Sequence, residues 1–150
     1  MAYCTQQDIL NSGISEKELS ELTSEDEGVI DAGTVAAAIK KADDEINSYV
    51  AVKYAVPLAT VPSLVNTWST KITKYYLFDG RAHRMGGIPY SIRDGYKDSI
   101  AQLKDVAKGS LSIGVDPPPA AKSTGQPSVE TNVGDNQDSR DFSKGKLKGF

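Results

Sequence analysis

The chain contains one cysteine and one histidine, Cys4 and His83, and these side chains could serve as nucleophile and general base. Cysteine catalysis requires an imidazole that takes up the thiol proton and becomes charged. The neighbouring Arg81 and Arg84 disfavour a charged His83, because like charges repel. A cysteine without an acid–base partner typically behaves as a small apolar residue. We therefore expect no catalytic residue, and we expect that the protein is not an enzyme.

An acidic turn ahead of Gly28 has the outline of a calcium-binding loop, in which acidic residues precede a glycine at the sixth position. Glu25 and Glu27 then occupy the third and fifth positions, where a shorter aspartate fits better. Thr34 occupies the twelfth, where calcium loops carry a glutamate that binds through both oxygens. We therefore expect a turn that caps the next helix, with no metal and no cofactor. A metal-assisted enzyme, the alternative, would require measurable affinity for calcium or magnesium.

Helices must position these residues, because capping signals and apolar periodicity recur from residue 5 to residue 109. Thr5 followed by Asp8 predicts the start of one short helix. Ser15 followed by Glu18 has the spacing of a capping box and predicts the start of a second. We expect both short helices to precede the main body of the fold.

Three longer helices are predicted after the acidic turn. Apolar residues from Asp31 onward recur every three or four positions, which predicts an amphipathic helix of about five turns. Pro62 opens the next helix, and a third runs from about Ser91 to Lys108. The expected core contains Val35, Ile39, Ile46, Trp68, Ile72, Tyr96 and Leu103. The opposite face of the first long helix is expected in solvent, with Lys40, Lys41, Asp43, Asp44 and Glu45.

Two segments interrupt the helical pattern. Residues 81–89 contain Gly86, Gly87 and Pro89, which predict a loop or break before the third long helix. Residues 111–115 alternate apolar with small side chains, which indicates either a short strand or an extended segment leading away from the bundle.

The composition changes after Asp116, where three prolines precede a stretch poor in apolar residues. We expect residues 1–115 to form a helical domain and residues 116–150 to form a long extended arm. The last nine residues carry apolar and basic side chains, and they suit a short anchor that becomes ordered on a partner. Its expected partner-binding residues are Phe142, Lys144, Lys146, Leu147, Lys148 and Phe150. The fold class is thus mainly α, a small bundle of three longer helices plus short N-terminal helices with this arm.

Charge is distributed unevenly along the chain, although the net charge is only −3. Residues 1–60 contain 11 acidic and 4 basic residues, whereas residues 61–109 contain 4 acidic and 8 basic ones. A small helical DNA-binding regulator is therefore an alternative, which would use Lys71, Lys74, Arg81, Arg84 and Arg93. The acidic isoelectric point near 5.2 argues against it. No apolar run is long enough for a membrane span, and no signal peptide is evident, so we expect synthesis in the cytoplasm.

The chain resembles the head–tail connector (neck or adaptor) proteins of Mu-like tailed bacteriophages. Seven blocks carry the resemblance: residues 1–8, residues 28–31, residues 42–46 with Tyr49, residues 54–58, residues 96–98, residues 103–109 and the C-terminal residues 142–150. The chain departs from common members at Glu25 and Glu27, where aspartates are usual, and at residues 86–89, where a helix often continues.

The resemblance implies a virion protein in the neck, between capsid and tail, present in the host cytoplasm during assembly. It implies a homo-oligomeric ring of twelve copies that binds the portal protein and the neighbouring neck or tail-completion protein. Genome DNA would pass non-specifically through the lumen. The resemblance implies neither catalytic residues nor a membrane.

Overall fold

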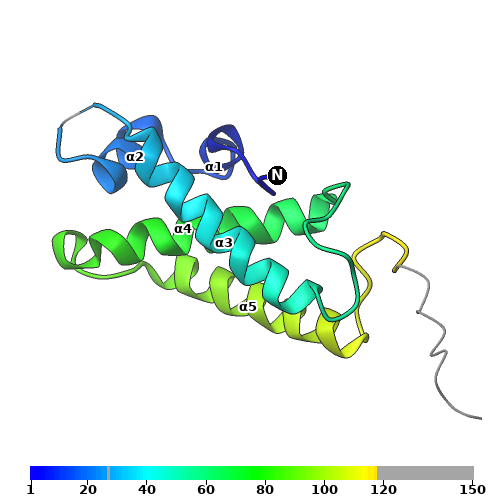
Figure 1. Cartoon of the computed structure of the whole chain (residues 1–150). Helices are drawn as coiled ribbons and strands as arrows, with labels where there is room; N and C mark the ends of the chain where they lie inside the picture. The colour runs from blue at the N-terminus through cyan, green and yellow to red at the C-terminus, as the bar shows by residue number, and fades with distance from the viewer. Residues whose placement is uncertain (27, 118–150) are drawn as a thin grey trace, which may run out of the picture. The chain divides into compact units, whose positions relative to one another are not determined.

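The computed structural model of the chain describes residues 1–26 and 28–117, and these residues form five helices and no strand (Figure 1). The prediction of a mainly α fold, with three longer helices after two short ones, is confirmed. Apart from residues 116 and 117, the expected arm lies outside the described residues.

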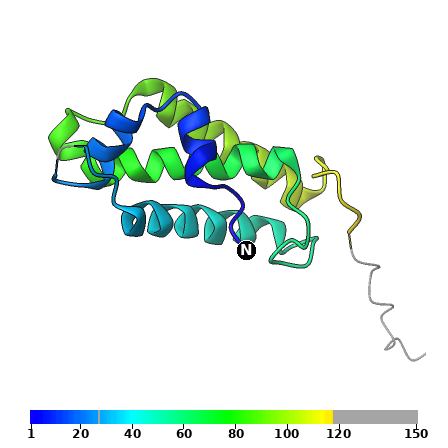
Figure 2. The same cartoon turned by 90° about the horizontal axis from the view of Figure 1, so that it is seen from above.

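The two short helices are α1 (Gln6–Asn11) and α2 (Glu16–Thr23). The Thr5 hydroxyl accepts from the Asp8 N–H at 3.2 Å, and the Asp8 carboxylate accepts from the Thr5 N–H at 2.8 Å. These reciprocal bonds form a capping box at the helix start that the sequence predicts. Ser15 likewise caps α2. Both helices pack against α4, and α2 also contacts α3 (Figure 2).

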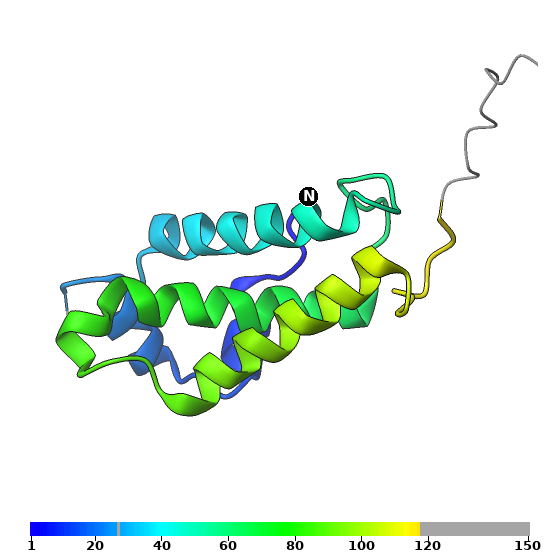
Figure 3. The same cartoon turned by 90° about the horizontal axis from the view of Figure 1, so that it is seen from below.

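The longer helices are α3 (Ala32–Val50), α4 (Ser63–Met85) and α5 (Tyr90–Lys108). Each runs antiparallel to the one before it, and α4 contacts both α3 and α5 (Figure 3). The side chain of Asp31 caps α3 by accepting from the Gly33 N–H at 2.8 Å. At the far end of the bundle, α5 terminates at Gly109, whose φ of 84° is one that glycine adopts without strain.

One boundary of α4 differs from the prediction, because residues 81–85 continue the helix instead of forming a loop. The segment Arg81–Met85 contains neither glycine nor proline, so nothing in it interrupts the backbone hydrogen bonds. The helix ends at Gly86, which has a φ of 73°. Residues 111–115 form neither the strand nor the extended segment leading away from the bundle: the backbone bends, with Gly114 at a φ of 81°, and Ile113 is buried in the first core cluster.

Two adjoining hydrophobic clusters form the core. The first lies between α3, α4 and α5 around Trp68, whose ring is 1% exposed and whose Nε1 donates to Gln102 Oε1 at 2.6 Å. The second joins α1 and α2 to the beginning of α3 and the end of α4. Of the residues expected in the core, all but one are buried, namely Val35, Ile39, Ile46, Trp68, Ile72 and Leu103. Tyr96 is partly buried against the first cluster.

A carboxylate at the junction of the three long helices binds two tyrosines. Glu45 of α3 accepts from the Tyr76 hydroxyl of α4 at 2.8 Å and from the Tyr96 hydroxyl of α5 at 2.9 Å. The rings of Tyr75 and Tyr96 stack, with centroids 4.1 Å apart. The expectation that Glu45 lies free in solvent is therefore wrong. Position 45 lies at the edge of the helix face that α4 and α5 cover, where a long carboxylate reaches both hydroxyls.

This arrangement raises the pKa values of both tyrosines. Burial is the larger cause, and the hydrogen bond to the Glu45 carboxylate adds to it, since both favour the neutral phenol. The pKa of Tyr76 rises to about 12, and the pKa of Tyr96 also rises. An unfolded chain would release these protons at about pH 10. The stabilisation is therefore complete below about pH 10 and is lost as the pH rises toward 12.

Replacing Glu45 by Gln should lower the pKa values of Tyr76 and Tyr96 part of the way toward that of free tyrosine, because the nearby negative charge is removed. Spectrophotometric titration of tyrosinate absorbance in the folded protein measures this shift. Glu21→Gln, at an exposed position of α2, is the matched control and should titrate like the unmodified protein. Identical titration curves for Glu45→Gln and the control would show that Glu45 does not hold the two hydroxyls.

Candidate interaction surface

The segment before α1 is fixed to the bundle through Tyr3. Its backbone N–H donates to both carboxylate oxygens of Asp43 on α3, at 3.2 and 3.3 Å. Its carbonyl oxygen accepts from Asn66 Nδ2 on α4 at 2.9 Å. The Tyr3 side chain is 1% exposed and belongs to the first core cluster. The N-terminal segment is thus held to α3 and α4 by hydrogen bonds as well as by apolar contact.

The Tyr3 hydroxyl attaches the same segment to the loop between α3 and α4, residues 51–62. It donates to Asn47 Oδ1 and accepts from the Leu58 N–H at 3.0 Å. Leu58 and Tyr54 are the buried residues of this loop. A single side chain therefore fixes the N-terminal segment, α3 and the loop relative to one another.

Asp43, the residue that accepts the Tyr3 N–H, is only 8% exposed. It also accepts from the Ser69 hydroxyl on α4 at 2.9 Å. Burial raises the pKa of Asp43, and the hydrogen bonds from Ser69 and Tyr3 partly offset that rise. The expectation that Asp43 lies on a solvated face is wrong. It follows Ile39 by four positions and precedes Ile46 by three, a spacing that places it on the same side of a helix as those core residues.

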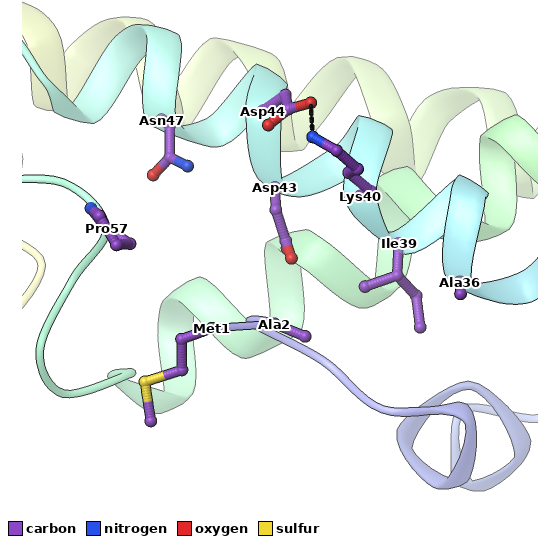
Figure 4. A pocket seen from close by; sticks show the side chains of 9 residues that line it. All are labelled: Met1, Ala2, Ala36, Ile39, Lys40, Asp43, Asp44, Asn47 and Pro57. Atoms are coloured by element: carbon purple, nitrogen blue, oxygen red, sulfur yellow. Dashed lines mark hydrogen bonds and ion pairs between the residues drawn. The ribbon is translucent and has the colours of Figure 1, made fainter.

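A groove of about 470 Å³ lies between the N-terminal segment, α3 and the α3–α4 loop. Its lining residues are Met1, Ala2, Ala36, Ile39, Lys40, Asp43, Asp44, Asn47 and Pro57 (Figure 4). Figure 4 shows Asp43 and Ile39 pointing from α3 toward the N-terminal segment. At the rim of the groove, Lys40 Nζ and Asp44 Oδ2 form an ion pair of 2.9 Å. The groove thus combines an apolar lining with a charged rim, a composition that suits an apolar peptide with polar flanks.

The residues considered for catalysis are placed apart. Cys4 is buried, with its Sγ 3.6 Å from Thr73 Oγ1, and burial raises the pKa of its thiol. His83 is exposed on α4, ten residues after Thr73. Ten residues of helix extend about 15 Å, so the imidazole does not meet the thiol.

The acidic turn is held by contacts within the chain. The Thr23 hydroxyl donates to the Leu19 carbonyl at 2.8 Å and accepts from the Asp31 N–H at 3.1 Å. Glu25 Oε1 lies 3.7 Å from an Arg81 guanidinium nitrogen. Glu27 lies outside the described residues. Within residues 1–26 and 28–117, no three His, Cys, Asp or Glu side chains lie where they could hold a metal together.

The basic residues of the DNA-binding alternative are divided between α4 and α5. Lys74 Nζ donates to the Ser12 carbonyl at 3.2 Å, and Arg81 Nε donates to the Leu22 carbonyl at 3.2 Å. Lys71 lines a polar groove beside Lys74, whereas Arg93 is exposed on α5. Arg84 lies in the last turns of α4.

None of the helices in the described part of the chain is long and apolar enough to cross a membrane.

The sequence also predicts anchor residues near the C-terminus. They lie outside the described residues, namely Phe142, Lys144, Lys146, Leu147, Lys148 and Phe150. Their partner-binding role remains a prediction from the sequence.

The chain matches a known protein family. The family model described as Bacteriophage Mu, Gp36 matches residues 3–131. The chain belongs to this Mu Gp36 family of bacteriophage proteins. The match to the Mu Gp36 family begins at Tyr3, includes all five helices and ends before Phe142.

Among curated relatives, the chain is similar to the Mu-like prophage FluMu protein gp36 of Haemophilus influenzae. The two sequences are 33% identical over 86 residues, which cover 57% of each chain. The aligned part therefore spans little more than half of that relative. Both comparisons agree on a Mu-like phage protein.

Replacing Asp43 by Ala should lower the free energy of unfolding by about 1–3 kcal/mol, because the Tyr3 N–H and the Ser69 hydroxyl lose their acceptor in a buried place. Asp44→Ala, the next residue on α3, removes only an exposed ion pair and should cost less than about 1 kcal/mol. Urea unfolding followed by circular dichroism measures both. Equal losses in the two variants would contradict the role assigned to Asp43.

Proposed function

We propose that this chain is a structural virion protein that forms the head–tail connector, a ring of copies that joins the portal to the next neck or tail component. The observation that carries this proposal is the match of the Mu Gp36 family to residues 3–131, which include every helix of the bundle. In this role the protein lies in the virion neck and is present in the host cytoplasm before assembly. It requires no catalysis and no cofactor.

The helical body suits a component that must keep its shape under load. Hydrogen bonds join segments that are distant in sequence, for example between Tyr3 and Asp43 and between Tyr96 and Glu45. Within the described part of the chain, no buried side-chain nitrogen or oxygen lacks a hydrogen-bond partner. A fully satisfied polar network disfavours alternative packings, because each of them would leave a buried group unpaired.

The charge distribution supports assembly from identical copies. The acidic surplus lies in residues 1–60, which include α3, and the basic surplus lies in residues 61–109, which include α4 and α5. A ring has a head-to-tail interface in which two different surfaces of the same chain meet. Opposite charges on those surfaces would favour the correct register and faster association.

The same asymmetry bears on the passage of DNA through the lumen. An acidic lining would let DNA slide, since it offers no cations to replace the counterions of the phosphates. A basic lining would hold the DNA instead. The proposal requires only non-specific contact with the genome.

The C-terminal arm attaches each copy to a neighbouring component. A segment such as 117–140 contains 24 residues and extends at most about 80 Å, so the anchor that follows it can reach a neighbouring component. Twelve arms, the number implied by the family resemblance, would hold the ring through multivalency even if each contact were weak.

Replacing Phe142, Leu147 and Phe150 together by Ala should leave the bundle folded and abolish the joining of capsids to tails, because the anchor loses its apolar side chains. The measurement is complementation of a phage that lacks this gene, with free capsids and complete virions counted by electron microscopy. A triple Ala replacement of Ser143, Gly145 and Gly149 is the matched control and should support assembly. Normal virion yield from the Phe142, Leu147 and Phe150 variant would contradict this role of the arm.

A further inference from the structure

One end of the bundle exposes apolar side chains next to the groove. The α3–α4 loop contains a single charged residue, Lys53. Apolar residues of this loop are exposed, namely Ala51, Val52, Ala55, Val56, Pro57 and Ala59. Val52 is 65% exposed, and Met1 at the groove is 81% exposed. Apolar surface that continues into a groove is typical of a docking site.

Hydrogen bonds within the chain hold the walls of the groove in place. Tyr3 fixes its N-terminal wall to α3 and fixes the loop wall through the Leu58 N–H. The Lys40 and Asp44 pair and the Asn47 amide offer polar partners at the rim. A short peptide with apolar anchors and basic residues between them would place the anchors against Ile39 and Pro57. Its ammonium groups would lie near Asp44 at the rim.

The C-terminal segment of this same chain has that composition. Residues 142–150 contain two phenylalanines and a leucine as anchors, with three lysines among them. Residues 1–60, from which every wall of the groove is built, contain 11 acidic and 4 basic residues. The apolar anchors of the segment therefore match the apolar side chains of the groove, and its lysines can compete with Lys40 for the Asp44 carboxylate at the rim.

The path of the chain also fits. Leu111, Ile113 and Val115 pack on the cluster that contains Tyr54 and Leu58 of the α3–α4 loop. The chain therefore leaves the helical bundle at the end where this loop lies (Figure 1). The 24 residues from 118 to 141 extend at most about 80 Å, far enough to pass beyond their own bundle to the next copy.

We propose that residues 142–150 of one copy bind in the groove between the N-terminal segment, α3 and the α3–α4 loop of a second copy. The choice of a second copy rests on the proposed function, since a ring places copies side by side. Each copy then donates one segment and accepts one, which satisfies every groove in a closed ring. The arm thereby connects neighbouring subunits.

The first test uses a fluorescent peptide of residues 137–150 and a chain that ends at Asp141, whose own anchor is removed. We expect saturable binding by fluorescence anisotropy. Ala36→Lys, which places a long cation in the groove, should weaken binding by about tenfold or more. Ala37→Lys is the matched control, because Ala37 is the next exposed residue of α3 and does not line this groove. Circular dichroism establishes that both variants fold.

A second measurement separates a neighbouring copy from the same copy. Analytical ultracentrifugation of the full chain should show self-association that Ala36→Lys weakens and Ala37→Lys preserves. The proposal is overturned if the peptide does not bind, if it binds equally to both variants, or if the full chain remains monomeric at all concentrations. None of these assays involves capsids or tails. Their failure is therefore distinct from a failure of the connector role, which would appear as a complete virion neck built without this protein.

Discussion

The hydrogen bonds between the Tyr3 backbone and the buried carboxylate of Asp43 determine how the N-terminal segment lies on the bundle. A buried carboxylate is costly unless hydrogen-bond donors surround it, and here Tyr3 and Ser69 provide them from two separate elements. Because the carboxylate needs Tyr3 and the Tyr3 N–H needs an acceptor, each holds the other in place. The N-terminal wall of the groove follows from this contact, and the Tyr3 hydroxyl in turn fixes the α3–α4 loop through the Leu58 N–H.

Glu45 has a comparable role at the junction of the long helices, where it accepts the hydroxyls of Tyr76 and Tyr96. Asp43 and Glu45 lie two residues apart on α3 and point to different neighbours. Asp43 meets the N-terminal segment and α4, and Glu45 meets α4 and α5. This helix is therefore joined to the N-terminal segment, α4 and α5 through polar contacts as well as apolar ones. A bundle held by these contacts keeps its fold while apolar side chains at one end stay exposed.

Local signals in the sequence predicted the helices well. The caps at Thr5 and Ser15 and the end at Gly109 depend only on residues close in sequence, so their chemistry can be recognised without the fold. The continuation of α4 through residues 81–85 could not be read from the local pattern, because the glycines that follow indicate a break but do not show how close to them the helix ends. The loop between α4 and α5 comprises only residues 86–89.

The groove could not be predicted in the same way. Its walls come from residues about 40 positions apart, and the pairing of Tyr3 with Asp43 has no local pattern. The spacing of Asp43 from Ile39 and Ile46 was nevertheless a usable signal. A carboxylate on the buried side of a helix implies a donor from another segment. The stretch of acidic and basic residues around it instead suggested a solvated face.

The connector role is tested most directly by cryo-electron microscopy of the intact virion neck. We expect a ring of this five-helix bundle between the portal and the next tail component, with density for the C-terminal arm joining it to adjacent protein. Density for this bundle elsewhere in the virion, or a complete neck built without it, would contradict the proposed function.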